Sequence, residues 1–342
     1  MTTQPRNRWE TLMGMAIVWI ATTSPSAWAG SLTPGDILVS STTDLQTSIL
    51  REYTPTGTLV QTFSVPVAPG GDAYSRGIAT DTSGNVQIYN RTCSPYLTTL
   101  DPTTSTFSNH TFGGWSTVND IYFGGVVVNG KYAYATDMAT DNPGGGPNGI
   151  VRFDLTNFSA TRFASGRANG SGDYTTVGQG LNGLLYAPWP GGSPVGDHID
   201  VINPVSMTKT TIDLPFLFQV SGVTADQSGN IYAVGALGYG HIYKLDSNGN
   251  VLASIATGFT GLTGLELSNS GELLTSSNGG EVIMTNTSFS QLSSFSVGSQ
   301  ITTFDTFVTP QAIGSVPEPA SLTLLAIGLG VVAFRMSRRR RR

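Results

Sequence analysis

The residues best suited to chemistry in this chain are a few carboxylates spread at wide intervals. Carboxylate oxygens suit Ca²⁺ or another divalent cation. Four carboxylates on or directly after expected innermost strands are candidate metal ligands: Asp81, Asp226, Glu266 and Asp305. Glu266 differs from the others, because it lies between Leu265 and Leu267, where related segments carry a small residue. For Asp81 and Asp226 there is an alternative, since an Asp before a Ser-Gly-Asn turn usually accepts hydrogen bonds from that turn.

Two further groups of residues suggest ligand binding. The Pro- and Gly-rich loop 137–149 contains Asp137 and Asp141, whose oxygens could hold a cation. Trp115 and Trp189 could stack on sugars, because an exposed indole suits the apolar face of a sugar ring. A packed aromatic side chain or an ordinary exposed turn is the alternative for each.

Catalytic motifs are missing from the sequence: it has no Gly-x-Ser-x-Gly, His-Glu-x-x-His, P-loop or Cys-x-x-Cys. Its histidines are His110, His198 and His241. The last two begin equivalent segments, which favours a shared structural role over that of a catalytic base. Cys93 is the only cysteine, so an intramolecular disulfide is impossible. We therefore predict no catalytic residue, and favour a binding or structural protein over an enzyme.

The elements that must position these residues form a repeat. Turn glycines recur 42 to 53 residues apart, at Gly84, Gly130, Gly183, Gly229 and Gly271. Each unit has four short segments rich in β-branched and aromatic residues, which favour strands. Four strands with this period are typical of β-propeller blades. We expect an all-β, six-bladed β-propeller over residues 30–310, with a pair of β-sandwiches as the alternative.

The first and last units are incomplete in a complementary way. Residues 34–65 supply three strands and lack the first, whereas residues 301–310 read as a single additional strand. We expect the late strand to complete the first blade, because closing the ring removes free sheet edges.

The N-terminal residues 1–29 have the parts of a secretory signal peptide. Arg6 and Arg8 precede an apolar run at 12–21, and Ala27-Trp28-Ala29 provides a small-x-small cleavage site. We expect export and cleavage after Ala29. An N-terminal anchor that is not removed is the alternative.

The C-terminal residues end in a short apolar segment and a block of arginines. Residues 321–334 would form a helix about 21 Å long, shorter than a hydrocarbon core of about 30 Å. Length alone therefore leaves a buried helix or a marginal span. Arginines at 335 and 338–342 favour a single transmembrane helix with its end in the cytoplasm, after a linker at 311–316.

The order Val316-Pro317-Glu318-Pro319-Ala320-Ser321, short apolar helix and arginine cluster resembles the PEP-CTERM sorting signal of Gram-negative bacteria. The resemblance implies that residues 317–342 are a sorting signal, in which Pro317, Glu318 and Pro319 are recognised rather than reactive. It implies an exosortase-type transpeptidase as partner, transient insertion in the inner membrane, and delivery to the cell surface or extracellular matrix.

The repeats, especially residues 222–256, resemble NHL-type and lactonase-type six-bladed propellers. The pattern is Gly-hydrophobic-x-x-Asp, Gly-Asn and Ile-Tyr, each in the same place along a unit. This resemblance implies an alternative function, a metal-dependent lactonase- or lyase-like enzyme with a divalent cation at the channel.

The net charge of the body limits the classes of partner that we expect. From residue 30 to residue 334, without Glu318, the chain has 9 basic and 20 acidic residues, a net charge of −11. Such a body repels phosphate backbones, so we expect no nucleic-acid partner. Extracellular polysaccharide is the ligand class we expect for a binding module.

Overall fold

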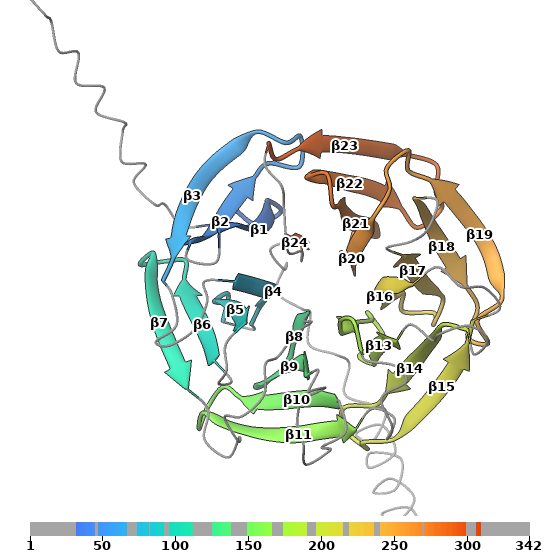
Figure 1. Cartoon of the computed structure of the whole chain (residues 1–342), viewed down its shortest axis with the longest axis horizontal. Helices are drawn as coiled ribbons and strands as arrows, with labels where there is room; N and C mark the ends of the chain where they lie inside the picture. The colour runs from blue at the N-terminus through green and yellow to red at the C-terminus, as the bar shows by residue number, and fades with distance from the viewer. Residues whose placement is uncertain are drawn as a thin grey trace, which may run out of the picture.

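Six antiparallel sheets of four strands each make up the part of the chain that the computed structural model describes (Figure 1). That part comprises residues 32–44, 47–66, 74–81, 83–91, 96–111, 125–137, 149–165, 174–189, 196–214, 219–235, 240–268, 270–298 and 306–308. The sheets stand around a ring, which confirms the predicted all-β six-bladed propeller.

Each blade runs from an inner strand near the centre to an outer strand at the rim (Figure 1). The inner strands are β24 (Thr306–Val308), β4 (Tyr74–Thr80), β8 (Val126–Asn129), β12 (Gly178–Gln179), β16 (Val220–Ala225) and β20 (Leu262–Leu267). The second strands are β1 (Ile37–Asp44), β5 (Val86–Arg91), β9 (Tyr132–Asp137), β13 (Leu185–Trp189), β17 (Ile231–Gly235) and β21 (Glu272–Ser277). The third strands are β2 (Thr47–Tyr53), β6 (Tyr96–Asp101), β10 (Gly149–Asp154), β14 (His198–Ile202), β18 (His241–Leu245) and β22 (Glu281–Asn286). The outer strands are β3 (Leu59–Val65), β7 (Thr106–Thr111), β11 (Ser159–Ser165), β15 (Lys209–Asp213), β19 (Val251–Ala256) and β23 (Leu292–Ser296).

The ring closes through the last strand, as the incomplete units predicted. β24 pairs antiparallel with β1, with Ile37 opposite Val308 and Val39 opposite Thr306. The first blade therefore joins one strand from the end of the described chain to three from its beginning. Without β24, β1 would be a free sheet edge.

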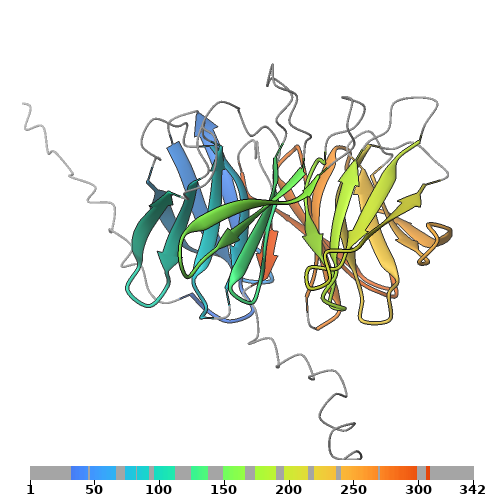
Figure 2. The same ribbon diagram turned by 90° about the horizontal axis from the view of Figure 1, so that it is seen from below.

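Two kinds of turn share one face of the disc, and we call this face the turn face. The turns from inner to second strands use the five predicted glycines, all with positive φ between +61° and +86°. This left-handed conformation is open to Gly at no steric cost. The turns from third to outer strands lie on the same side, because the strands of each blade alternate in direction. Figure 2 shows the disc from the side, with these turns along its lower edge.

The core lies between neighbouring blades rather than in one central cluster. Tyr89 of β5 packs on Phe153 of β10 with ring centroids 6.1 Å apart, and both side chains are fully buried. Near the centre the inner strands approach backbone to backbone. A Cβ added at Gly222 would lie 2.5 Å from the carbonyl carbon of Gly264 in the next blade. Glycine is thus required there by space and not by φ.

The predicted signal peptide (1–29), linker (311–316) and sorting signal with its helix (317–342) lie outside the described residues. Within the described ranges, no helix is long and apolar enough to cross a membrane.

Candidate functional site

Two of the candidate metal ligands hydrogen-bond within their own turns. In Asp226, one carboxylate oxygen accepts from the backbone N–H groups of Ser228 and Asn230, both at 2.9 Å. The other accepts from the Asn230 side chain at 2.6 Å and the Tyr232 hydroxyl at 3.2 Å. Burial raises the pKa of Asp226, but these hydrogen bonds outweigh it and lower the pKa below its usual value. The carboxylate is therefore held ionised by its own turn.

Asp81 repeats this arrangement in the second blade, directly after β4. One oxygen accepts from the N–H groups of Ser83 and Asn85, at 2.8 and 2.9 Å. The other accepts from the side chains of Asn85 and Gln87, at 3.1 and 3.0 Å. Each of these two aspartates thus has both oxygens engaged in ordering the hairpin that follows an inner strand.

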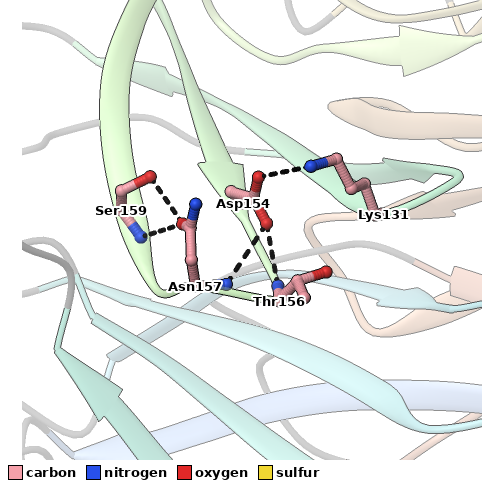
Figure 3. A network of polar contacts seen from close by, with 5 residues as sticks. All are labelled: Lys131, Asp154, Thr156, Asn157 and Ser159. Carbon is pink, nitrogen blue, oxygen red and sulfur yellow. Dashed lines mark hydrogen bonds and ion pairs between the residues drawn. The ribbon is translucent and has the colours of Figure 1, made fainter.

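A related network orders a turn of the third blade (Figure 3). Asp154 accepts hydrogen bonds from the N–H groups of Thr156 and Asn157, at 2.9 and 3.3 Å, and from Lys131 Nζ at 2.8 Å. The Lys131 hydrogen bond is the first cause of the lowered pKa of Asp154. Sequence reasoning missed this ion pair, because its partners lie 23 residues apart and meet only when β9 folds back on β10.

Glu266 lies on inner strand β20, which borders the centre of the ring (Figure 1). Its neighbours Leu265 and Leu267 are buried, whereas Glu266 is only half-buried. Among the described residues, no group of three or more His, Cys, Asp or Glu side chains is placed to hold a metal ion. Asp305 lies outside the described residues, so a cation site built on Glu266 stays a prediction.

The predicted loop sites are only partly described. Asp137 is the last residue of β9 and pairs with Gly149 across the loop. Asp141 and Trp115 lie outside the described residues.

Trp189, a candidate for stacking on sugars, lies in the interior of the protein. Its side chain is 3% exposed, because all five residues of β13 are buried between the flanking strands. The indole stacks on His198, with ring centroids 3.8 Å apart and planes 15° from parallel. The placement matches the packed-aromatic alternative.

His198 also contacts a carboxylate that sequence reasoning did not single out. Its Nδ1 lies 2.5 Å from an Asp213 oxygen, and the two residues are opposite each other in the β14–β15 register. A carboxylate at Nδ1 favours the tautomer that leaves Nε2 as an acceptor. Nε2 is buried and has no hydrogen-bond partner within the described structure. The arrangement orients the ring, and burial keeps the basic nitrogen away from solvent.

A buried carboxyl pair was also missed. Glu52 is fully buried on β2 and Asp36, just before β1, is 6% exposed. Glu52 accepts from the Thr33 N–H at 2.7 Å and from Gln61 at 2.5 Å. Burial raises the pKa of both carboxyls, and the charge of Asp36 raises that of Glu52 further. The hydrogen bond from the Thr33 N–H to Glu52 holds the residues that precede β1 against β2.

The sorting residues Pro317, Glu318 and Pro319 lie outside the described residues. The structure does show where the fold leads into them. β24 ends at Val308, opposite the first residue of β1, so the chain leaves an inner strand on the turn face.

The comparisons with known proteins concern the tail and the fold. Residues 315–342 match the PEP-CTERM protein-sorting motif. No curated protein matches the chain. Similar solved structures include a nidogen/laminin complex, with 14% identity, a TM-score of 0.56, and coverage of 78% of this chain and 95% of that one. A protein of unknown function from Bacteroides caccae has 11% identity, a TM-score of 0.51, and coverage of 79% and 98%.

At these identities the solved structures support the fold alone. The sorting motif also bears on localisation, because it implies an exported protein that is sorted by exosortase and anchored in a membrane before processing. The chain therefore carries a PEP-CTERM sorting motif behind a six-bladed β-propeller.

Proposed function

We propose that this protein is displayed at the cell surface or in the extracellular matrix, where its propeller serves as a binding or structural module. The observation that carries the proposal is the PEP-CTERM motif at residues 315–342, immediately after a ring that is already closed at Val308. In this account the signal peptide directs export, the helix at 321–334 anchors the precursor, and exosortase cuts near Pro317–Pro319. The propeller is the part delivered.

The hydrogen bonds of the described carboxylates support a binding or structural module rather than an enzyme. Asp81, Asp154 and Asp226 bind the backbone of their own turns. The body is acidic, which favours uncharged or cationic partners over nucleic acid. Extracellular polysaccharide is the partner class we propose, because its neutral sugars escape this repulsion.

Deleting exosortase from the producing bacterium tests the proposed sorting. We expect the full-length precursor to accumulate in the membrane fraction and to disappear from the surface fraction. Glu318→Ala should give the same result in the wild-type strain, whereas Ser315→Ala, just outside the proposed recognition residues, should be sorted normally. Normal surface delivery without exosortase would refute the proposal.

Binding is tested separately with the purified mature protein. We expect it to be retained by extracellular polysaccharide from the producing strain and not by DNA at the same ionic strength. Failure to bind polysaccharide would leave the sorting result intact and would overturn only the proposed partner.

A further inference from the structure

Among the described residues, several large apolar side chains are exposed at the turn face. The most compact groups are three pairs from three blades: Leu59 with Val60, Val205 with Met207, and Val251 with Leu252. Each pair lies in the turn from third to outer strand or begins the outer strand after it. The side chains are 45% to 92% exposed, and Val205 is the most exposed.

These positions are ones where turns usually carry polar residues. The equivalent turn of the second blade does so, with exposed Thr103 and Thr104. Met207 occupies the positive-φ position of its turn at +58°, as the polar Ser105 does in the second blade at +54°, and a bulky side chain rarely adopts that conformation. The pairs lie on the first, fourth and fifth blades and do not form one contiguous patch, so a broad flat surface such as a bilayer is what would meet all three at once.

The path of the chain indicates which contact this is. β24, which ends at Val308, lies close to the centre of the ring (Figure 1), and its last residue is on the turn face because it pairs with the first residue of β1. Twelve residues, 309–320, separate it from the apolar segment 321–334. Fully extended, they reach about 40 Å at roughly 3.3–3.6 Å per residue. A short tether attached near the centre of one face brings that whole face toward the anchor.

The charge of the turn face limits which lipid headgroups this face can contact. Turns of the same kind in the second, third and fifth blades carry Asp101, Asp154 and Asp246, each ordering its own turn, and of these Asp154 is paired with Lys131. An acidic rim repels anionic headgroups, so the contact must come from apolar burial at the boundary between headgroups and acyl chains.

We infer that the turn face rests on the bilayer in the anchored precursor, with the three apolar pairs in the headgroup boundary and the opposite face turned away. This inference rests on the membrane anchor of the proposed function. Cleavage at the sorting motif would then free this face, and the opposite face would be accessible both before and after release.

The test uses the full chain reconstituted in zwitterionic vesicles that contain nitroxide-labelled lipid. A fluorophore is placed at Val205→Cys on the turn face or at Thr111→Cys, the exposed last residue of β7 on the opposite face, both in a Cys93→Ser background. We expect quenching to remove most of the fluorescence at 205 and little at 111. Equal quenching at both positions, or stronger quenching at 111, would overturn the inference.

A second variant separates apolar contact from tethering alone. Val251→Ser with Leu252→Ser should reduce quenching at 205, whereas exchanging the exposed Ala253 and Ser254 on the same strand should not. Unchanged quenching in the first variant would overturn the apolar contact. Extraction of the full chain by alkaline carbonate would overturn the anchor and the inference together, while retention with no quenching at 205 would overturn the inference alone. A dimer cross-linked through residue 205 without quenching would assign the face to a second copy instead.

Discussion

Removing the closing strand should weaken the propeller by an amount that the structure allows us to estimate. β24 forms three residue pairs with β1, against Ile37, Leu38 and Val39, whose side chains are at most 2% exposed. At about 1 kcal/mol of net stability per hydrogen bond, three pairs contribute about 2–4 kcal/mol. A loss of this size lowers Tm by roughly 2–4 °C per kcal/mol, so by about 4–16 °C in total.

The assay compares thermal unfolding of chains that span residues 30–310 and 30–300. The longer chain lacks the sorting tail but keeps β24, and should unfold like the full mature protein. The shorter chain should unfold at the lower temperature. Phe307→Pro in the longer chain disrupts β24 without removing residues, so it should also lower the unfolding temperature.

Equal unfolding temperatures for the two chain lengths would refute this reasoning, since they would mean that β24 adds nothing to the ring. The expected result has a functional consequence. Cleavage near Pro317 leaves β24 in place, so processing would release the propeller without opening it.

Three other predictions concern single residues. Gly222→Ala should lower the free energy of unfolding by about 1–3 kcal/mol, because the new Cβ would overlap the Gly264 backbone, whereas the exposed Ser228→Ala should change it little in denaturant titrations. Asp226 has a lowered pKa in the fold, so its ionised form stabilises the protein above the unfolded pKa of about 3.9, and this contribution is lost as pH falls through the lowered folded value. The stability difference between wild type and Asp226→Asn, followed by unfolding at pH 7 and below pH 3, should therefore shrink in acid, and a constant difference would contradict the assignment. If Glu266 holds a cation, calorimetric Ca²⁺ titration of the mature protein should show binding that Glu266→Gln abolishes; identical titrations would exclude this residue as a ligand.

The fold could be predicted because its signals are local and repeated. A Ser-Gly-Asn turn needs a left-handed Gly, and Gly84 and Gly229 both adopt that conformation. Closure followed from counting strands, since a first unit without an inner strand requires one from elsewhere. Asp81 and Asp226 were assigned correctly to their turns by the alternative interpretation, which depends only on residues up to six positions away.

The site residues were harder to predict because they depend on contacts between strands and blades. Trp189 looks exposed beside a Pro- and Gly-rich loop, but it ends a strand that is buried on both sides. The contact between His198 and Asp213 appears only once the β14–β15 register is known. Glu52 lies in a polar-looking segment, and nothing near it in the sequence shows that it is fully buried.

The most direct test of the central claim is the mass of the C-terminal peptide of the mature surface protein, measured in strains with and without exosortase. We predict that surface protein from the wild-type strain ends near Pro319 and lacks the arginine cluster. In the strain without exosortase, the protein should stay in the membrane and end at Arg342. Surface protein that retains the intact arginine tail in the wild-type strain would contradict the account.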